Sequence, residues 1–304
     1  MKHLLSILLI FLLGFGNLLI AQEIDLSYTF VKDKQYRLNV RTQQLIEQDL
    51  GGFTQNVVNL IESDILFKIT EVKGDSAVLE VAYQSLYFSM DGPMGEGMVM
   101  SSKGDRNDPI NKVVRSMVNN PFYVHLNKSG KILSVEGMED VLGKINESLE
   151  LIDDELKESI QASIDNQFGE ESFKSSFMTG LIAYPSKSLK VGDTWNSSMS
   201  DYSTIPLEMK TTWHLLNVRR NTADIEGKAT LQSKDKDARS NDESIGMTGT
   251  NVIKATVNIG TGWLQESTQT SEISGIMILP PDKYFNEAVE IPLKIKTVTR
   301  TVLK

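Results

Sequence analysis

Four methionines stand close together in a glycine-rich stretch, at Met90, Met94, Met98 and Met100. Thioether sulfur is a soft ligand, and methionines grouped in a chain without cysteine are suited to Cu(I) in an oxidising compartment. Methionine also adapts to varied apolar surfaces, so such a loop can contact a ligand or a partner protein. A third interpretation is a hairpin loop whose methionines fold back onto the core. We single out these four residues as candidate ligand or partner contacts.

Other residues with catalytic chemistry are scarce. The chain has no cysteine and three histidines, of which His125 and His214 lie in alternating segments typical of a solvated strand face. No H-E-x-x-H, G-x-S-x-G, P-loop or G-x-G-x-x-G pattern occurs. The sequence therefore gives no support to metal hydrolysis or to the common nucleophile motifs, and we expect no metal and no cofactor.

Carboxylates are plentiful, and the densest group is Asp153, Asp154, Glu155 and Glu158. Asp154 and Glu158 share a helix face, which could attract calcium. Their spacing matches no calcium loop, so a solvated helix face is the better interpretation. The same holds for Asp235, Asp237, Asp242 and Glu243. An enzyme with a dispersed carboxylate site stays as an alternative and requires two acids about 5–10 Å apart in a cleft.

The first residues predict a secretory signal peptide. Lys2 precedes an apolar run from Leu4 to Leu13, and small Ala21 stands before Gln22. This pattern indicates cleavage between Ala21 and Gln22 and an extracytoplasmic protein, periplasmic or secreted. An uncleaved membrane anchor is the alternative. No other apolar run approaches spanning length, so we expect a mature chain that does not span the membrane.

The charge balance excludes one class of partner. The chain has 40 acidic and 31 basic residues, a formal net charge of −9. Phosphate backbones repel such a surface, and no basic stripe overrides the average. We therefore expect no nucleic-acid partner.

A β-hairpin at Phe67 to Tyr83 is the clearest local feature. Apolar residues alternate on both sides of a turn at Lys73-Gly74-Asp75. A weak echo lies 146 residues later, at Trp213 to Ala229, where Trp213 takes the place of Phe67. We interpret the two stretches as a possible internal duplication.

The hydrophobic period changes to about 3.6 in the centre of the chain. An apolar stripe begins at Met138 and continues toward Thr179, which predicts an amphipathic helical segment. The sequence thus predicts an α+β fold of mostly antiparallel strands, with two similar β-sheet halves and the helical segment packed on the sheet. We divide the chain into a signal peptide (1–21), an N-terminal β-rich half (22–137), the helical segment (138–180) and a C-terminal β-rich half (181–304). A single domain that integrates both halves is the alternative.

Several short stretches carry a resemblance to a known family. They are the leader ending in Ile-Ala-Gln, the ITEVKGD hairpin, the HLNKSGKILSVEG segment, the stretch from Tyr184 to Trp195, and Gly260-Thr261-Gly262-Trp263. Together they resemble an uncharacterised family of secreted Bacteroidota proteins defined only as a domain of unknown function. The resemblance implies an extracytoplasmic location and brings no catalytic residues.

Three functions remain open. The first is a non-enzymatic, extracytoplasmic binding or carrier-type protein, since curved sheets with an apolar helical stripe between them can enclose a hydrophobic ligand. The second is an envelope-associated structural or protein-interaction module that uses the methionine loop as its contact surface. The third is the enzyme with a dispersed carboxylate site. The absence of a catalytic motif leads us to favour the first, without deciding whether the chain is an enzyme.

Overall fold

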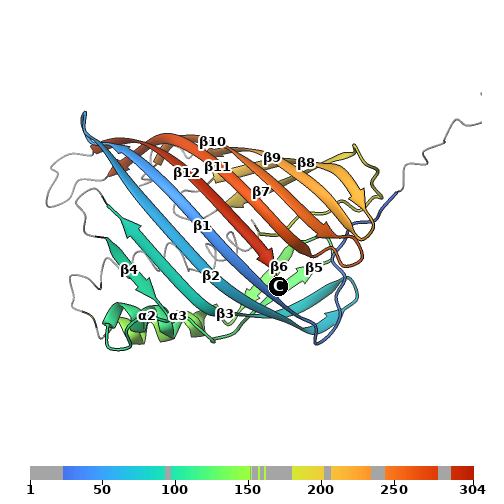
Figure 1. Cartoon of the computed structure of the whole chain (residues 1–304), viewed down its shortest axis with the longest axis horizontal. Helices are drawn as coiled ribbons and strands as arrows, with labels where there is room; N and C mark the ends of the chain where they lie inside the picture. Colours follow the sequence, from blue (N-terminus) through green and yellow to red (C-terminus); the bar gives the residue numbers. More distant parts are fainter. Residues whose placement is uncertain are drawn as a thin grey trace, which may run out of the picture.

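The computed structural model describes residues 23–92, 97–150, 152, 157, 161, 180–201, 207–233, 244–279 and 289–304. Within them a 12-stranded antiparallel sheet dominates the molecule (Figure 1). The strands are β1 (Gln35–Asp49), β2 (Thr54–Lys73), β3 (Ser76–Asp91), β4 (Met98–Ser101), β5 (Phe122–Asn127), β6 (Ile132–Glu136), β7 (Thr194–Asp201), β8 (Leu207–Arg219), β9 (Thr222–Ser233), β10 (Ser244–Asn258), β11 (Leu264–Leu279) and β12 (Val289–Leu303).

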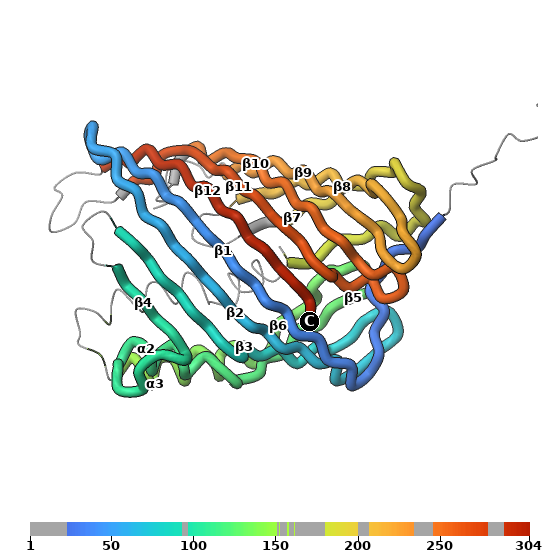
Figure 2. The backbone as a smooth tube through the Cα atoms, viewed as in Figure 1, coloured from blue at the N-terminus to red at the C-terminus, as the bar shows by residue number. Residues whose placement is uncertain are grey.

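The predicted α+β class with two β-sheet halves was wrong. The strand order is β6-β5-β3-β2-β1-β12-β11-β10-β9-β8-β7, with β4 beside β3, so strands from both ends of the chain share one sheet. The join is the pairing of β1 with β12, which runs from Leu38 opposite Leu303 to Gln48 opposite Leu293 (Figure 2). A strand's alternation shows which face it buries but not which strand it pairs with, so the sequence could not reveal this join.

The helices cover only part of the sheet. Among the described residues they are α2 (Pro109–Ser116) and α3 (Met138–Leu149). Asp108 caps α2 by accepting a hydrogen bond from the Ile110 backbone N–H at 2.9 Å, and Pro109 follows at the first helical position. Asp108 and Pro109 together therefore fix the start of α2. Neither helix has the length and apolarity needed to cross a bilayer.

The predicted apolar stripe of the helical segment is confirmed over α3, where Met138, Val141, Ile145 and Leu149 are buried. Most of the segment beyond Glu150 lies outside the described residues, as does the whole predicted signal peptide. The acidic groups at Asp153 to Glu158 and Asp235 to Glu243 lie there too.

The sheet curves around the main core. Ile69, Leu79 and Val124 face one another across β2, β3 and β5 and are fully buried. The same contiguous core contains Leu215, Ile225 and other side chains of β8 to β10. Apolar residues on one side of both ends of the sheet therefore meet, which makes that side the concave face.

The two similar hairpins share one irregularity. β2 and β3 shift register between Ile69 and Glu71, and β8 and β9 shift between Leu215 and Asn217, 146 positions later. Such shifts mark a bulge that bends a strand and increases its twist. The predicted hairpins at Phe67 to Tyr83 and Trp213 to Ala229 are thus confirmed, with matching local bends, inside a single sheet.

Two extended segments, 23–30 and 181–190, close one end of the concave face. The backbone N–H of Tyr28 donates to Lys128 in the β5–β6 turn, and that of Thr29 donates to Thr261 in the β10–β11 turn, at 2.8 and 2.9 Å. The Tyr184 hydroxyl donates to the Gly262 carbonyl at 2.7 Å. These bonds connect the turns of two distant hairpins and hold this end of the sheet together.

Candidate functional site

Aromatic rings form the floor of a site at the closed end of the concave face. The indole of Trp263 lies 4.8 Å from the rings of both Tyr28 and Tyr36 and 5.2 Å from that of Phe67, measured between centroids. Its Nε1 donates to the Thr29 carbonyl at 3.4 Å. Rings that contact one another in this way are fixed in position and present a stable apolar surface. We call these four rings the aromatic floor.

A cavity of about 170 Å³ lies against the aromatic floor. For comparison, a cavity of about 150 Å³ lined by apolar side chains can hold a benzene molecule. Its lining residues are Tyr28, Leu38, Val40, Ser63, Ile65, Phe67, Tyr83, Gly180, Leu181, Trp263, Leu264, Ser267, Gln269, Thr299, Thr301 and Leu303. The floor side of this lining is apolar, whereas the side toward the middle of the sheet carries hydroxyl and carboxamide groups.

These polar groups belong to three successive rows across the concave face of β2, β1, β12, β11 and β10. Paired residues share a face, so each row follows from the strand register. We call the set the polar band; its members are Ser63, Thr301 and Ser267 in the first row, Thr42, Thr299 and Gln269 in the second, and Asn59, Gln44, Thr297, Ser271 and Asn251 in the third. Rows are two residues apart along a strand, about 6.8 Å. Beyond the third row the face becomes apolar again, at Ile295, Ile273, Leu231 and Met209.

Hydrogen bonds satisfy only part of the polar band. The Asn59 Nδ2 donates to Gln44 Oε1 at 3.0 Å, and the Gln44 Nε2 donates to the Thr297 hydroxyl at 3.4 Å. The Asn251 Nδ2 approaches the Met209 sulfur at 3.5 Å. The Oδ1 atoms of Asn59 and Asn251 are both buried and accept no hydrogen bond from the described protein. Buried carboxamide oxygens normally have a donor, so two acceptors here are left open.

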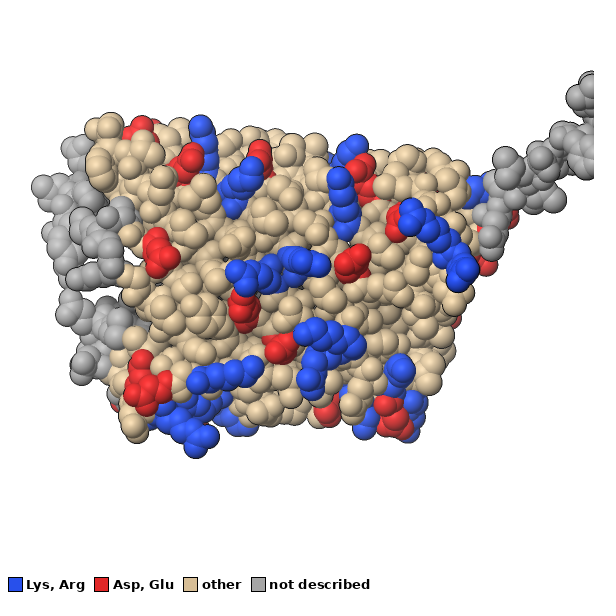
Figure 3. Space-filling model, in the orientation of Figure 1, with Lys and Arg blue, Asp and Glu red and all other residues tan. Residues whose placement is uncertain are grey.

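Charged side chains are on the other face of the sheet. The third-row residue Thr297 lies between Lys296 and Val298, and the second-row residue Gln269 between Thr268 and Thr270. Figure 3 shows Lys, Arg, Asp and Glu spread over the face toward the viewer, where β1, β2 and β12 lie. Among the described residues that line the cavity or form the polar band, none is charged.

The tyrosines beside the cavity stay neutral. Burial raises the pKa of Tyr28 and of Tyr83 well above the ordinary value of a phenol. Burial likewise raises the pKa of Tyr184, with the neighbouring Tyr28 adding to the effect. The site therefore contains hydroxyl groups without phenolate charge near neutral pH.

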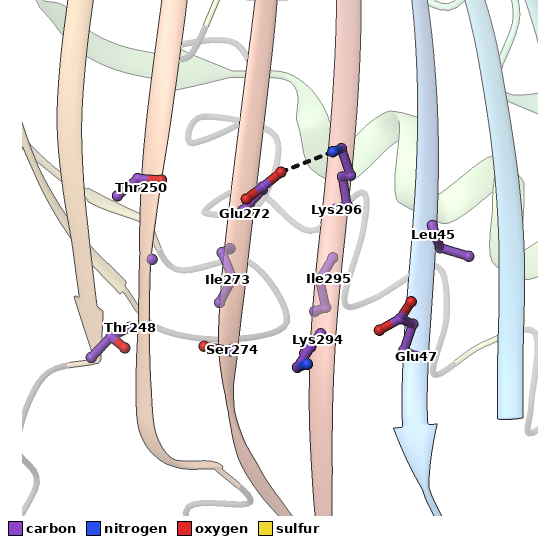
Figure 4. A pocket seen from close by; sticks show the side chains of 11 residues that line it. Leu45, Glu47, Thr248, Thr250, Glu272, Ile273, Ser274, Lys294, Ile295 and Lys296 are labelled. Carbon is purple, nitrogen blue, oxygen red and sulfur yellow. Dashed lines mark ion pairs between the residues drawn. The ribbon is translucent and has the colours of Figure 1, made fainter. Parts of the chain in front are cut away.

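A depression of about 550 Å³ lies over β1, β10, β11 and β12 (Figure 4). Its polar rim includes one cross-strand ion pair. Glu272 bonds Lys296 at 2.9 Å, and Glu47 stands opposite Lys294 in the register. Exposed pairs of this kind contribute about 0–1 kcal/mol. In the described lining, each of these two glutamates therefore stands opposite a lysine and not opposite another acid.

Three of the four predicted methionines lie on the neighbouring strands β3 and β4. Met90 and Met98 face each other across β3 and β4, and Met100 packs against the main core. The register places all three on the concave side, since Met90 pairs with Asn59 of the polar band. Met94 lies outside the described residues. Their contact with a ligand or partner stays a prediction.

Each of the two described histidines lies close to a glutamate. His125 Nε2 lies 3.2 Å from Glu136 Oε1, and His214 stands opposite Glu226 on the outer side of β8 and β9. Among the described residues, no three His, Cys, Asp or Glu side chains are placed to hold a metal ion.

The fold and this site define an all-β protein with one curved antiparallel sheet and an uncharged concave site. The chain belongs to a family of unknown function (DUF6263), whose profile matches residues 74–264. The predicted membership of such a family is confirmed, while secretion and a Bacteroidota source stay predictions. No curated protein matches the sequence. A solved structure titled "lipid-protein interactions in lipovitellin" matches 91% of this chain at 12% identity and a TM-score of 0.47, and the alignment spans 25% of that structure's chain.

Sequence reasoning missed the residues of the cavity and the polar band. One signal was available. The stretch from Glu266 to Glu272 is entirely polar although it lies within a long strand, and Thr297, Thr299 and Thr301 add polar residues to the buried side of β12. A central strand that is polar on both faces cannot be packing an apolar core along its whole length. Such strands are candidates for lining a site.

Proposed function

We propose that this protein is a non-enzymatic binding or carrier-type protein that holds a hydrophobic small molecule on the concave face of its sheet. The observation that carries the proposal is the cavity of about 170 Å³ beside Trp263. Its floor is apolar and fixed by ring contacts, and its other side opens onto the polar band. Binding sites for small molecules commonly combine an apolar lining with a few placed polar groups.

The size of the cavity limits what it can enclose. Drug-sized ligands occupy pockets of about 300–1,000 Å³, larger than this cavity. The enclosed part of the ligand is therefore a chain end or a single ring, and the rest extends along the concave face. A molecule with a flexible apolar chain fits this description better than a rigid multi-ring compound.

The proposal includes an extracytoplasmic location. Its support is the sequence pattern of Lys2, the apolar run Leu4 to Leu13 and Ala21. N-terminal sequencing of the protein isolated from its natural host tests this part, with Gln22 expected as the first residue. A chain that still begins at Met1 would contradict it.

Mass spectrometry of organic extracts tests the binding function. Protein purified from its natural host is expected to release an apolar molecule in near-stoichiometric amount. A Val40→Phe variant fills part of the cavity and is expected to lose that molecule. Gln43→Phe is the matched control, because Gln43 lies on the exposed outer side of the same strand.

A second measurement tests the binding function even if the natural ligand is lost during purification. A brominated alkyl chain that enters the cavity is expected to quench the fluorescence of Trp263, and Trp263→Phe removes that quenching. The chain also contains Trp195 and Trp213, which stack on each other at 6.2 Å and supply the background signal. If nothing co-purifies and no brominated chain gives Trp263-dependent quenching, the proposed function is wrong.

A further inference from the structure

We propose that the bound molecule is an uncharged amphiphile with a hydroxyl group at its polar end, such as a long-chain alcohol or a monoacylglycerol. Its apolar chain would lie on the aromatic floor and its hydroxyl group in the polar band. This inference rests on the proposed function and specifies the class of ligand. It follows from charge, from hydrogen-bonding capacity and from the distance between the two parts of the site.

The described lining of the site disfavours ionised head groups. A carboxylate or phosphate that leaves water for this face finds no lysine or arginine among the described lining residues. A cationic head likewise finds no carboxylate there. Burial of an ion without a counter-ion is strongly unfavourable, whereas a neutral polar group needs only hydrogen bonds. The charged residues of β11 and β12, such as Glu272 and Lys296, are on the opposite face.

The open acceptors specify a donor. Asn251 is 1% exposed, and its Oδ1 has no hydrogen-bond partner. The Oδ1 atom of Asn59 is also buried and also has no hydrogen-bond partner. A carboxamide oxygen can only accept, so the missing partner must carry an O–H or N–H group. An ester, ether or ketone offers further acceptors and would leave both oxygens unpaired. A hydroxyl group donates to such an oxygen and can accept from a neighbouring serine or threonine.

The distances suit an extended chain. Gln269 lines the cavity and pairs with Ile253, so Asn251 is its diagonal neighbour, at about 7–8 Å. Leu303 lies at the apolar end of β12, and Thr299 lies in the second row of the polar band. The distance between them along the strand is two rows, about 14 Å. A molecule whose chain end rests near Trp263 therefore places its head group in the polar band.

Two matched probes test the inference on the unmodified full-length protein. They are 9,10-dibromostearyl alcohol and 9,10-dibromostearic acid, which share one quenching chain and differ in the head group. Titrations at pH 8 ionise the acid, and Trp263-dependent quenching reports binding of each. The alcohol is expected to bind at least tenfold more tightly than the acid.

One substitution is expected to reverse this preference. Gln269→Lys places a cation at the band and should strengthen binding of the acid at least tenfold. Thr268→Lys is the matched control, because it changes the net charge equally but on the exposed outer face. If urea denaturation shows that Gln269→Lys does not fold, Thr299→Val replaces it, with weaker binding of the alcohol and unchanged binding of the acid expected.

The results separate the inference from the proposed function. Tighter binding of the alcohol, together with the response of either band variant, supports the hydroxyl-bearing ligand. Equal binding of both probes, or tighter binding of the acid by the unmodified protein, overturns the inference and leaves a hydrophobic-ligand protein. Absence of Trp263-dependent quenching by both probes overturns the proposed function and this inference with it.

Discussion

Two buried asparagines of this chain should respond in different ways to the same substitution. Asn111 uses its whole side chain, since its Oδ1 accepts from the Ser101 backbone N–H at 2.7 Å and its Nδ2 donates to the Asp108 carboxylate at 3.0 Å. Asn251 has one contact with a sulfur atom and an unpaired oxygen. We compare Asn111→Ala with Asn251→Ala in the free energy of unfolding.

The expected magnitudes follow from the hydrogen bonds. Asn111→Ala removes two bonds of about 1 kcal/mol each and leaves the Ser101 N–H buried without a partner, which costs a further 1–3 kcal/mol. The expected loss is about 3–5 kcal/mol. Asn251→Ala removes a buried unpaired oxygen, whose desolvation costs about 1–3 kcal/mol in the native state. That gain offsets the small void left by truncation, so we expect a change within about 1 kcal/mol of zero.

Urea denaturation followed by tryptophan fluorescence measures both values. The protein is first stripped of bound apolar molecules by organic extraction, since a ligand in the site would stabilise the native state. A loss for Asn251→Ala as large as that for Asn111→Ala would refute the reasoning, because it would mean that the Asn251 oxygen already has a strong partner. Near-neutral stability combined with weaker binding of the alcohol probe is the expected pair of results.

Further predictions concern the closed end of the molecule. Burial raises the pKa of Tyr28, Tyr83 and Tyr184, so the native state keeps phenolic protons that the unfolded chain releases above pH of about 10. Stability should be unaffected by these groups below that pH and fall above it by about 1.4 kcal/mol per pH unit for each tyrosine. The ionisation of tyrosine is measured by ultraviolet titration, and circular dichroism reports whether the protein is still folded. Ionisation of all three tyrosines near pH 10 in the folded protein would contradict this prediction. Gly262→Ala should destabilise the fold by about 3 kcal/mol or more, since a Cβ there would lie 2.2 Å from the Ser27 carbonyl oxygen. Gly74→Ala, also at positive φ but with free space around it, should cost only about 1–2 kcal/mol, and equal urea midpoints for the two variants would show that no clash exists.

Local elements of the fold could be predicted from the sequence. The turn at Gly74 has a φ of +57°, and the alternation on its two sides predicts the hairpin of β2 and β3. The capping aspartate before Pro109 predicts the start of α2 in the same way. Each of these features depends on residues within about twenty positions of one another, so the pattern contains the information.

The class of the fold depends on a contact that no local pattern contains. Leu38 pairs with Leu303 across almost the whole chain, and this pairing makes one sheet out of two runs of strands. The site was missed for a related reason. Trp263 and Tyr28 come together only when segment 23–30 crosses the concave face, and the alternation of each strand gives no sign of it.

The pairing of β1 with β12 has a consequence for the order in which the molecule can form. β12 comprises the 15 residues from Val289 to Leu303, and its two partners are β1 and β11. At synthesis rates of about 5–20 residues per second, β1 waits about 10–50 s for this partner. During that time β1 presents an open edge, which is the kind of surface through which nascent β proteins aggregate. β12, which follows the other described strands along the chain, thus closes the middle of the sheet, and contacts of such long sequence separation form slowly. Until β12 has been synthesised, the strands that precede it cannot complete the single sheet.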